Sequence, residues 1–303
     1  MEVASDKVKT LTETVRRRRF GHDMTRTDFH AYLEARRVLI DKALDQVLPP
    51  VTRAPQSVHA AMRHAVLGSG KRLRPILSMA TSELVELPLE RAMPCACAVE
   101  LIHNASLILD DLPCMDNATE RRGNPCVHVA FGEATALLAV MGLIAKAYEL
   151  SARAGNSDVM ACLAAAMGTS GLVAGQHADL ALTGNGISID AIEEAHQGKS
   201  AALFVAATQA PALLAGMESA GLEALESYAR NLGLAFQITD DLLDAMNGLE
   251  DVGKDTFVSQ LGAEGARNRV EQLVASALGA LDRWGARADA LRMMADYVGA
   301  RSR

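Results

Sequence analysis

The segment Ala105–Asp116 reads Ala-Ser-Leu-Ile-Leu-Asp-Asp-Leu-Pro-Cys-Met-Asp and places Asp110, Asp111 and Asp116 directly after an apolar run. A buried helix that ends in two carboxylates is unfavourable unless a cation compensates their charge. The C-terminus of a helix also carries partial negative charge, which adds to the repulsion. The pattern therefore favours a bound cation, while a surface helix end with solvated aspartates is the simpler alternative.

A second acidic cluster lies in Phe236–Asp244 (FQITDDLLD), again after an apolar run. Asp240 and Asp244 are four residues apart, so a helix places them on one face, where like charges repel unless they share a cation. Carboxylates without His or Cys suit hard cations, and Mg²⁺ takes its remaining ligands from water and substrate phosphates. The two clusters together predict two walls of a cavity that holds Mg²⁺ and a phosphorylated ligand.

Basic residues accompany both clusters along the chain. Arg offers paired donors to a phosphate, and Lys offers a point charge. No nucleophilic triad can be assigned, and Gly68-Ser69-Gly70-Lys71 lacks the spacing and the preceding strand of a Walker loop. The basic candidates for phosphate contact are Lys71, Arg74, Arg121, Arg122, Lys199 and Lys254.

The composition favours a soluble helical protein. Of the 303 residues, 50% are hydrophobic and only 4% are aromatic, with Ala and Leu abundant. The net charge of −7 argues against nucleic acid as a partner. No segment contains ~18 uninterrupted apolar residues, so we expect no stable membrane insertion. The five cysteines lack zinc-ligand spacing and indicate buried thiols in a reducing cytoplasm.

Helical periodicity with short punctuation predicts an all-α fold. We expect residues 1–26 to form a solvated, poorly ordered tail, since no apolar stretch follows Arg16–Arg19 to make an export signal. Residues 27–303 should form one mainly antiparallel bundle of more than four helices. The helices expected after residue 85 are Leu89–Asp111, Glu133–Ala154, Val159–Leu182, Asp190–His196, Ser200–Met217, Leu222–Met246, Gly262–Trp284 and Ala288–Gly299.

These motifs, in this order, resemble those of the trans-isoprenyl diphosphate synthases of the polyprenyl synthetase family. Within that family, the chain is most similar to bacterial carotenoid-type and plant-type geranylgeranyl diphosphate synthases. The resemblance implies an all-α bundle around a central cavity and a homodimer. The stretches that carry it are GKRLRP (70–75), HNASLILDDLPCMDNATERRG (103–123), FGE (131–133), GQHADL (175–180), GKS (198–200) and GLAFQITDDLLD (233–244).

The resemblance implies a role for each matching residue. Three Mg²⁺, or Mn²⁺ in their place, hold the allylic diphosphate on Asp110, Asp111, Asp116, Asp240 and Asp244, with Asp241 as a further catalytic carboxylate. Isopentenyl diphosphate contacts Lys71, Arg74, His103 and Arg122. The allylic diphosphate contacts Arg121, Gln176, Lys199 and Gln237, with Asp179 as an acidic neighbour and Ser200, Phe236 and Lys254 as further substrate-binding residues.

The implied reaction joins isopentenyl diphosphate to an allylic diphosphate, namely dimethylallyl, geranyl or farnesyl diphosphate. Ala105 and Ser106 precede Asp110 by five and four residues and are small, so the resemblance implies a geranylgeranyl (C20) product. One alternative is a farnesyl diphosphate synthase. Another is a weakly active regulatory subunit, because the segment Met246–Asp255 is short and carries a single lysine. A terpene cyclase fits less well, since it needs no second diphosphate site.

Overall fold

The computed structural model describes residues 26–182, 187–248 and 255–301. The first described helix begins at Arg26, one residue before the predicted domain start. The predicted tail, apart from that residue, and Lys254 lie outside the described residues. Within them, strand is limited to one short antiparallel hairpin, in which Glu120–Arg121 pairs with Asn124–Pro125.

The described chain is otherwise helical, which confirms the predicted all-α class. The helices are α2 (Arg26–Val47), α3 (Gln56–Leu67), α4 (Leu73–Leu84), α5 (Leu89–Asp110), α6 (Val127–Phe131), α7 (Glu133–Arg153), α8 (Ser157–Met167), α9 (Leu172–Leu180), α10 (Ile189–His196), the π turn η1 (Gln197–Ala201), α11 (Ala202–Leu214), α12 (Ser219–Asn247), α13 (Phe257–Ala280), the 3₁₀ turn η2 (Asp282–Ala288) and α14 (Asp289–Ala300). The strands are β1 (Glu120–Arg121) and β2 (Asn124–Pro125).

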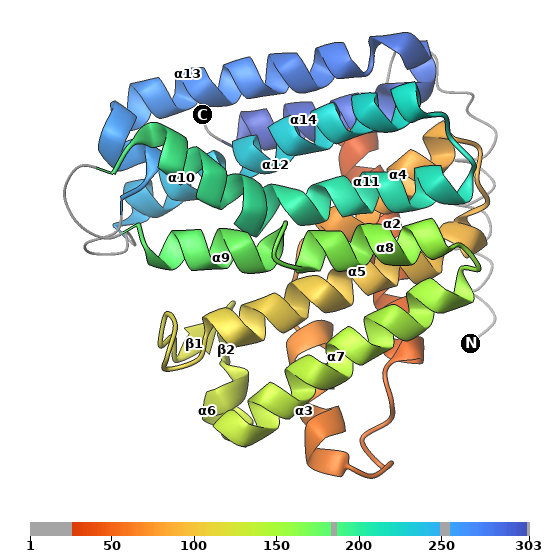
Figure 1. Cartoon of the computed structure of the whole chain (residues 1–303), viewed down its shortest axis with the longest axis vertical. Coiled ribbons are helices and arrows are strands. Elements are labelled where there is room, and N and C mark those ends of the chain that lie inside the picture. Colours follow the sequence, from red (N-terminus) through yellow and green to blue (C-terminus); the bar gives the residue numbers. More distant parts are fainter. Residues whose placement is uncertain (1–25, 183–186, 249–254, 302–303) are drawn as a thin grey trace.

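Helix α5 runs through the middle of the bundle (Figure 1). It packs against α4, α7 and α11, while α12 packs against α11, α13 and α14. Buried residues occur all round α5, from Cys95 and Leu101 to Ala105 and Ile108. A helix that is apolar on every side belongs in a core. The aspartates at the C-terminal end of α5 therefore follow a helix that lies in the protein interior, as the sequence predicts.

Several predicted helix boundaries were wrong. The predicted helix Val159–Leu182 is two helices, because Gly168–Gly171 interrupts it; a Cβ on Gly171 would lie 2.2 Å from the carbonyl oxygen of Ala166. The predicted helix Ser200–Met217 begins with a π turn and ends at Leu214. The predicted helix Gly262–Trp284 belongs to α13, which begins at Phe257 because Thr256 and Ser259 form a capping box, and which ends at Ala280. Gly262 has a non-helical φ of +70° and marks a kink, so the regular helix that continues to Ala280 starts close to the predicted residue.

Three stretches have the length and mean hydropathy that could cross a membrane, judged by those two properties alone: Leu89–Asp110, Glu133–Arg153 and Ser157–Leu180. The criterion of uninterrupted apolar residues did not detect them. The most apolar window of the first is 67% buried in the bundle, compared with 39% and 33% for the other two. Packing therefore accounts for the apolar surface of α5 more fully than for that of α7.

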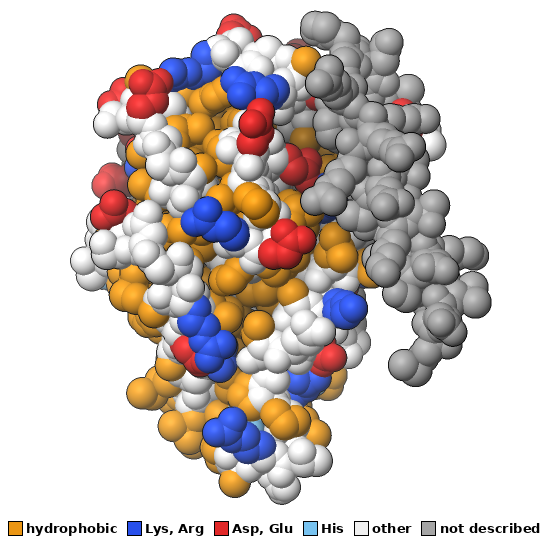
Figure 2. Space-filling view, turned by 90° about the vertical axis from the view of Figure 1, so that its right-hand side faces the viewer, with side chains coloured by type: hydrophobic (Ala, Val, Ile, Leu, Met, Phe, Trp, Pro, Cys, Tyr) orange, Lys and Arg blue, Asp and Glu red, His pale blue; other side chains and the backbone are white. Residues whose placement is uncertain are grey.

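Charges of both signs are interspersed on the face of the molecule shown in Figure 2, between areas of hydrophobic side chains. No continuous basic stripe follows the described part of this face.

Candidate active site

The first aspartate cluster lies where α5 ends. Asp110 is the last helical residue and Asp111 is the C-cap. The loop then turns back, and the amide of Asp116 donates a 2.9 Å hydrogen bond to the carbonyl oxygen of Asp110. The turn 111–116, which contains Pro113, thus brings the third aspartate of the motif back beside the first. Asp110 and Asp111 are buried, whereas Asp116 is exposed.

The two buried aspartates of this cluster differ in their charge balance. Arg121, on β1, donates to the Asp111 carboxylate at 2.7 Å. Burial raises the pKa of Asp110 to about 6, and the negative charge of Asp116 adds to the rise while Lys199 opposes it. Asp110 is therefore a carboxylate that lacks sufficient positive charge in its surroundings.

The second cluster lies in the C-terminal half of α12. Asp240 forms a 2.6 Å ion pair with Arg301. Burial raises the pKa of Asp241 to about 7, and the negative charges of Asp240 and Asp244 add to the rise. A hydrogen bond from Gln237 opposes it. The Oδ2 atom of Asp241 is buried and has no hydrogen-bond partner among the described residues.

Close backbone contacts bring α9, η1 and α12 together beside these clusters. A Cβ on Gly175 would lie 1.9 Å from the backbone nitrogen of Lys199, so no side chain fits there. A Cβ on Gly233 would lie 2.6 Å from the Cα of Ala201. Because positions 175 and 233 are glycine, the backbones of α9, η1 and α12 can come into contact. The side chains next to these contacts therefore lie near one another.

Polar contacts link the segments that meet at these glycines. The Lys199 ammonium donates to Asp179 at 2.6 Å, and Ser200 donates to Gln237 at 2.6 Å. Burial alone would lower the pKa of Lys199, but Asp110 and Asp179 raise it above its ordinary value. Lys199 thus stays charged beside the first aspartate cluster.

Asp179 relates the two aspartate clusters electrostatically. Its negative charge raises the pKa of Asp110 on α5 and of Asp241 on α12, in both cases after the larger effect of burial. Charges that act on both clusters lie between them or close to both. Both predicted clusters therefore lie within electrostatic range of Asp179.

A set of basic residues lies beside the second cluster. Arg74 Nη1 is 3.3 Å from His103 Nε2, and its guanidinium stacks on Phe204 with Cζ 4.8 Å from the ring centroid. Burial lowers the pKa of Arg74 to about 10, and Asp240 opposes this effect. Burial, followed by the charge of Arg74, holds the pKa of His103 well below its usual range, so this imidazole is neutral.

Lys71 and Arg122 complete this basic set. Burial lowers the pKa of Lys71, and the positive charges of Arg301 and Arg122 lower it further. Burial also lowers the pKa of Arg122. Mutual repulsion among cations is relieved by a bound anion, so the set is suited to a diphosphate.

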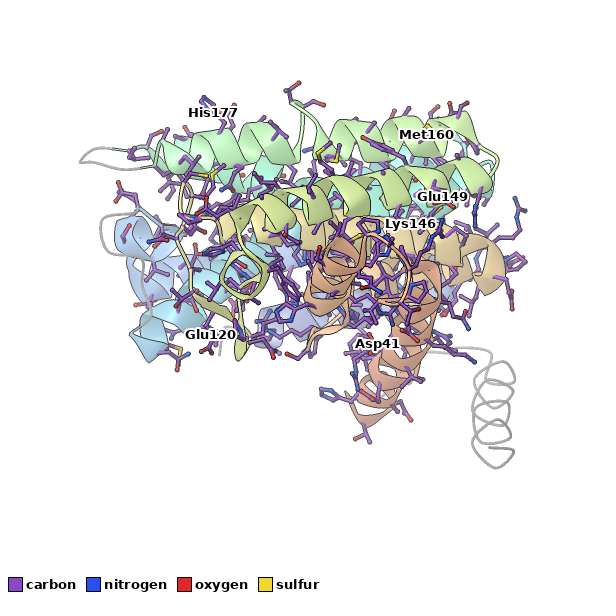
Figure 3. The ribbon with its side chains drawn as sticks, turned by 90° about the horizontal axis from the view of Figure 1, so that it is seen from below. Asp41, Glu120, Lys146, Glu149, Met160 and His177 are labelled. Atoms are coloured by element: carbon purple, nitrogen blue, oxygen red, sulfur yellow. The ribbon has the colours of Figure 1, made fainter. Side chains whose placement is uncertain are left out.

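The remaining predicted residues occupy different positions. Gln176 is buried, and neither its amide nitrogen nor its amide oxygen has a partner among the described residues; His177, the next residue, is exposed on the outer side of α9 (Figure 3). Phe236 packs on Phe204, with ring centroids 5.5 Å apart. Ala105 is a buried core residue, and the neighbouring Ser106 hydroxyl donates to the carbonyl oxygen of His103 at 2.8 Å.

Sequence reasoning missed Arg301. This residue follows α14 near the end of the chain, yet its guanidinium pairs with Asp240 and stacks on Phe236, with Cζ 4.9 Å from the ring centroid. Its Nη1 atom is buried without a partner among the described residues. A single arginine after a terminal helix carries no signal by itself, because only the fold shows that α14 ends beside α12.

The donor atoms suit a hard divalent cation that is completed by its ligand. The two clusters offer carboxylate ligands. The Asp241 oxygen without a hydrogen-bond partner and the pKa of Asp110, which is raised chiefly by burial, both fit a site that a cation would complete. No group of three or more potential protein ligands is assembled at one point within the described residues. The residues thus fit ions that are shared between the two walls and a diphosphate.

Comparisons with known proteins agree with this geometry. Residues 55–258 match the family model for polyprenyl synthetase. The chain is 41% identical to the chloroplastic large subunit 1 of the heterodimeric geranylgeranyl pyrophosphate synthase of Arabidopsis thaliana, over 81% of this chain and 72% of that protein. It is 39% identical to the chloroplastic geranylgeranyl pyrophosphate synthase of Capsicum annuum, over 89% and 78%.

Solved structures give the same answer. An FPP/GFPP synthase from Zymomonas mobilis superposes with a TM-score of 0.83 and 38% identity, covering 90% of this chain and 99% of that chain. A geranyltransferase from Legionella pneumophila gives a TM-score of 0.82 and 30% identity, covering 90% and 97%. Together with the two aspartate motifs, these similarities establish that the chain belongs to the polyprenyl synthetase family of prenyltransferases.

Proposed function

We propose that this prenyltransferase condenses isopentenyl diphosphate with dimethylallyl, geranyl or farnesyl diphosphate and releases geranylgeranyl diphosphate. The main support is that two different sets of residues are each suited to a diphosphate. One is the basic set of Lys71, Arg74 and Arg122 with neutral His103. The other joins the aspartate clusters with Lys199. A single-substrate enzyme would need only the second.

The second environment is proposed to hold the allylic diphosphate. Its candidate direct contacts are Arg121, Lys199, Gln176 and Gln237. Both amide atoms of Gln176 lack a hydrogen-bond partner among the described residues, so they are available to bind an anion or water. We propose Mg²⁺ as the metal, three ions per site with Mn²⁺ as a substitute, held by Asp110, Asp111, Asp116, Asp240 and Asp244. When bound, these ions would supply positive charge to the departing diphosphate.

The chemistry proposed for the substrates needs no protein base. Loss of diphosphate leaves an allylic carbocation, the double bond of isopentenyl diphosphate adds to it, and a proton then leaves to the released diphosphate. His103 is neutral and lies against Arg74, which suits a hydrogen-bonding role. The apolar side chains around Phe204 and Phe236 exclude the water that would quench a carbocation.

The C20 product is proposed from the size of two residues. Ala105 and Ser106 lie one helical turn before Asp110 and are both buried, so a growing chain meets small side chains at this level of α5. Each further buried methylene contributes about 0.8 kcal/mol, so the chain extends until a bulky side chain blocks it. Val140–Ile144 on α7 is the proposed deeper barrier.

Related proteins show why product length needs a direct test. Besides geranylgeranyl synthases, they include a geranylfarnesyl diphosphate synthase of Leucosceptrum canum, 40% identical over 81% of this chain. Labelled isopentenyl diphosphate should be offered with dimethylallyl, geranyl or farnesyl diphosphate, and the products separated by chain length. A C20 product from all three supports the proposal, and accumulation at C15 would instead support a farnesyl diphosphate synthase.

The same assay tests the regulatory-subunit alternative. A weakly active subunit would give little product alone and would raise the turnover of an added homologous synthase. This alternative has a specific motive, because two of the similar Arabidopsis proteins are large subunits of heterodimers. The intact aspartate motifs favour independent activity.

We propose a homodimer formed through α7. Leu137, Leu138 and Met141 are 47%, 53% and 67% exposed. Met141 lies three and four residues after the two leucines, so it neighbours both on the surface of α7. The other end of α7 is polar, where Lys146 pairs with Glu149 (Figure 3). A second copy is the proposed cover for the apolar face. Met141→Lys should shift the protein toward monomer in analytical ultracentrifugation, whereas Arg153→Ala on the polar end should not.

A cytoplasmic location is proposed from thiol chemistry. All five cysteines are free. Cys95, Cys97 and Cys126 are buried, but Cys162 is only partly buried and Cys114 is exposed, so the expectation of buried thiols was wrong for Cys114. Burial raises the pKa of both thiols to about 12, so neither is reactive. Fractionation of cells that express a tagged chain would test this location.

A further inference from the structure

Arg72 lies between two of the proposed diphosphate ligands, Lys71 and Arg74, yet the protein itself binds its guanidinium. Nε donates to Asp41 at 2.8 Å and Nη1 donates to Glu100 at 2.9 Å. The side chain is 2% exposed and that of Glu100 is 4% exposed. Arg72 therefore differs from its two neighbours, since four of its five donor hydrogens are accounted for within the protein once its two carbonyl contacts are included.

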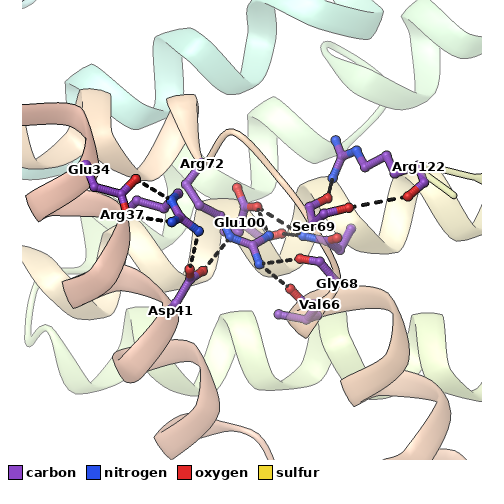
Figure 4. A network of polar contacts seen from close by, with 10 residues as sticks. Glu34, Arg37, Asp41, Val66, Gly68, Ser69, Arg72, Glu100 and Arg122 are labelled. Atoms are coloured by element: carbon purple, nitrogen blue, oxygen red, sulfur yellow. Dashed lines mark hydrogen bonds and ion pairs between the residues drawn. The ribbon is translucent and has the colours of Figure 1, made fainter. Parts of the chain in front are cut away.

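The contacts of Arg72 join three helices to one loop (Figure 4). Its Nη2 atom donates to the carbonyl oxygens of Val66 at 2.7 Å and Gly68 at 2.9 Å, at the C-terminal end of α3. Asp41 belongs to α2 and Glu100 to α5. The guanidinium thus satisfies carbonyls that the end of α3 leaves open, and it fixes the loop 68–72 relative to α2 and α5.

The backbone of Arg72 has a conformation that needs this support. Its φ is +52° and its ψ is +31°, in the left-handed region, at the residue before α4 begins. A residue with a side chain rarely adopts this conformation, because its Cβ then lies too close to the following carbonyl oxygen. It persists where surrounding contacts fix the residue. The turn at Arg72 starts α4 and places Arg74 in its first turn.

The positive charges on and around the loop repel one another. The positive charge of Arg122 lowers the pKa of both Lys71 and Arg74, after the larger effect of burial. Glu100 opposes these effects at Arg74 and at Arg122, whose pKa values it raises. The carboxylate that holds Arg72 therefore also offsets the charge of two members of the basic set.

The loop is tied to the hairpin that carries Arg122. Arg122 Nη1 donates to the carbonyl oxygen of Ser69 at 3.3 Å, and the Ser69 hydroxyl donates to the carbonyl oxygen of Arg122 at 3.4 Å. A Cβ on Gly70 would lie 2.9 Å from Arg72 Nη1 and 3.0 Å from Arg122 Nη1. The guanidinium groups of Arg72 and Arg122 thus both lie close to Gly70, the residue before Lys71.

We propose that Arg72, held by Asp41 and Glu100, is the positioning residue of the isopentenyl diphosphate site. It sets the spacing of Lys71, Arg74 and Arg122 and makes no contact with substrate itself. This inference rests on the proposed function, because it assumes that those three cations bind isopentenyl diphosphate.

The test is steady-state kinetics of the intact enzyme with Mg²⁺, varying isopentenyl and farnesyl diphosphate separately. In Arg72→Lys, one ammonium cannot reach all four acceptors of the guanidinium. The KM for isopentenyl diphosphate should rise about tenfold or more, as expected for misplaced binding groups, while the KM for farnesyl diphosphate stays within about twofold. A merely structural role would lower the melting temperature and affect both substrates alike.

Asp41→Asn supplies a milder variant, because Asp41 is 36% exposed and its loss leaves Arg72 bound to Glu100. The matched control is Asp45→Asn, one turn further along α2, where the carboxylate pairs with Arg63 on α3 and does not touch the loop. We expect the KM for isopentenyl diphosphate to rise in Asp41→Asn and to stay unchanged in Asp45→Asn. If Arg72→Lys does not fold, this pair decides the question.

Lys71→Ala separates the two hypotheses. If Lys71→Ala leaves the KM for isopentenyl diphosphate unchanged, the proposed site assignment fails. If Lys71→Ala raises that KM, but Asp41→Asn matches Asp45→Asn and folded Arg72→Lys matches wild type, the positioning role of Arg72 is overturned and the site assignment stands.

Discussion

Replacing Asp241 with asparagine should stabilise the metal-free protein at pH 8. Burial is the main cause that raises the pKa of this carboxyl from 3.8 to about 7. At 1.36 kcal/mol for each pKa unit, keeping Asp241 ionised in the folded state costs up to about 4 kcal/mol. Asparagine has the same shape, carries no charge and can still accept the hydrogen bond that Gln237 donates at 3.0 Å. We expect a gain of about 2–4 kcal/mol in the free energy of unfolding.

The sign of the pH dependence follows from the direction of the shift. The folded protein binds the Asp241 proton more tightly than the unfolded chain does, so this group stabilises the fold most at acidic pH. Its contribution falls as pH rises through the range between the ordinary pKa and the raised value of about 7. The advantage of Asp241→Asn over wild type should therefore be largest at pH 8 and shrink to less than about half at pH 5.

Urea unfolding in excess chelator at pH 5 and pH 8 measures this difference. Asp244→Asn is the comparison variant, because Asp244 is exposed on the same helix. Its charge contributes less than burial to the raised pKa of Asp241, so the gain in stability should be smaller. Adding Mg²⁺ with inorganic diphosphate should reverse the order, since wild type then binds ligand that the variant binds poorly. If Asp241→Asn is no more stable than wild type at pH 8 in chelator, burial of an uncompensated carboxylate is the wrong account of this cluster.

Three further outcomes are expected. Asp110→Ala and Asp240→Ala should each lower kcat by several orders of magnitude without unfolding the chain, which single-turnover assays and circular dichroism check. Excess chelator should abolish turnover of the wild type, and full turnover in chelator would exclude a metal requirement. Lys71→Ala and Arg74→Ala should raise the KM for isopentenyl diphosphate more than that for the allylic substrate, whereas equal effects would mean that they do not form a separate site. Ala105→Phe should shift the product from C20 toward C15; unchanged product with stability lowered by about 1–3 kcal/mol would show that Ala105 only packs in the core.

Much of the catalytic end of the bundle could be predicted from the sequence. The α5 prediction ended within one residue of the observed end at Asp110, because an apolar run with a following proline marks a buried helix and its termination. The four-residue spacing of Asp240 and Asp244 likewise required one helical face. These signals are local, so a single sequence contains them.

Other features depend on contacts between distant segments. Arg72 stands in a basic run beside two proposed ligands, and only its bonds to Asp41 and Glu100 distinguish it from them. Arg301 joins the site only because α14 returns to α12. The break between α8 and α9 had a local signal, since Gly168 and Gly171 are three residues apart, but an abundance of alanine on both sides kept the helical pattern continuous.

The π turn at Gln197–Ala201 makes the site sensitive to chain length as well as to residue identity. A π turn holds one residue more than the equivalent α-helical path. Deleting one residue from it would restore the α-helical path between α10 and α11 and remove the wide turn that carries Gly198 and Lys199. Lys199 would then leave Asp179, and Gly198 would leave Gly175, although every motif residue was still present. Variant libraries for this enzyme should therefore treat 197–201 as a segment of fixed length.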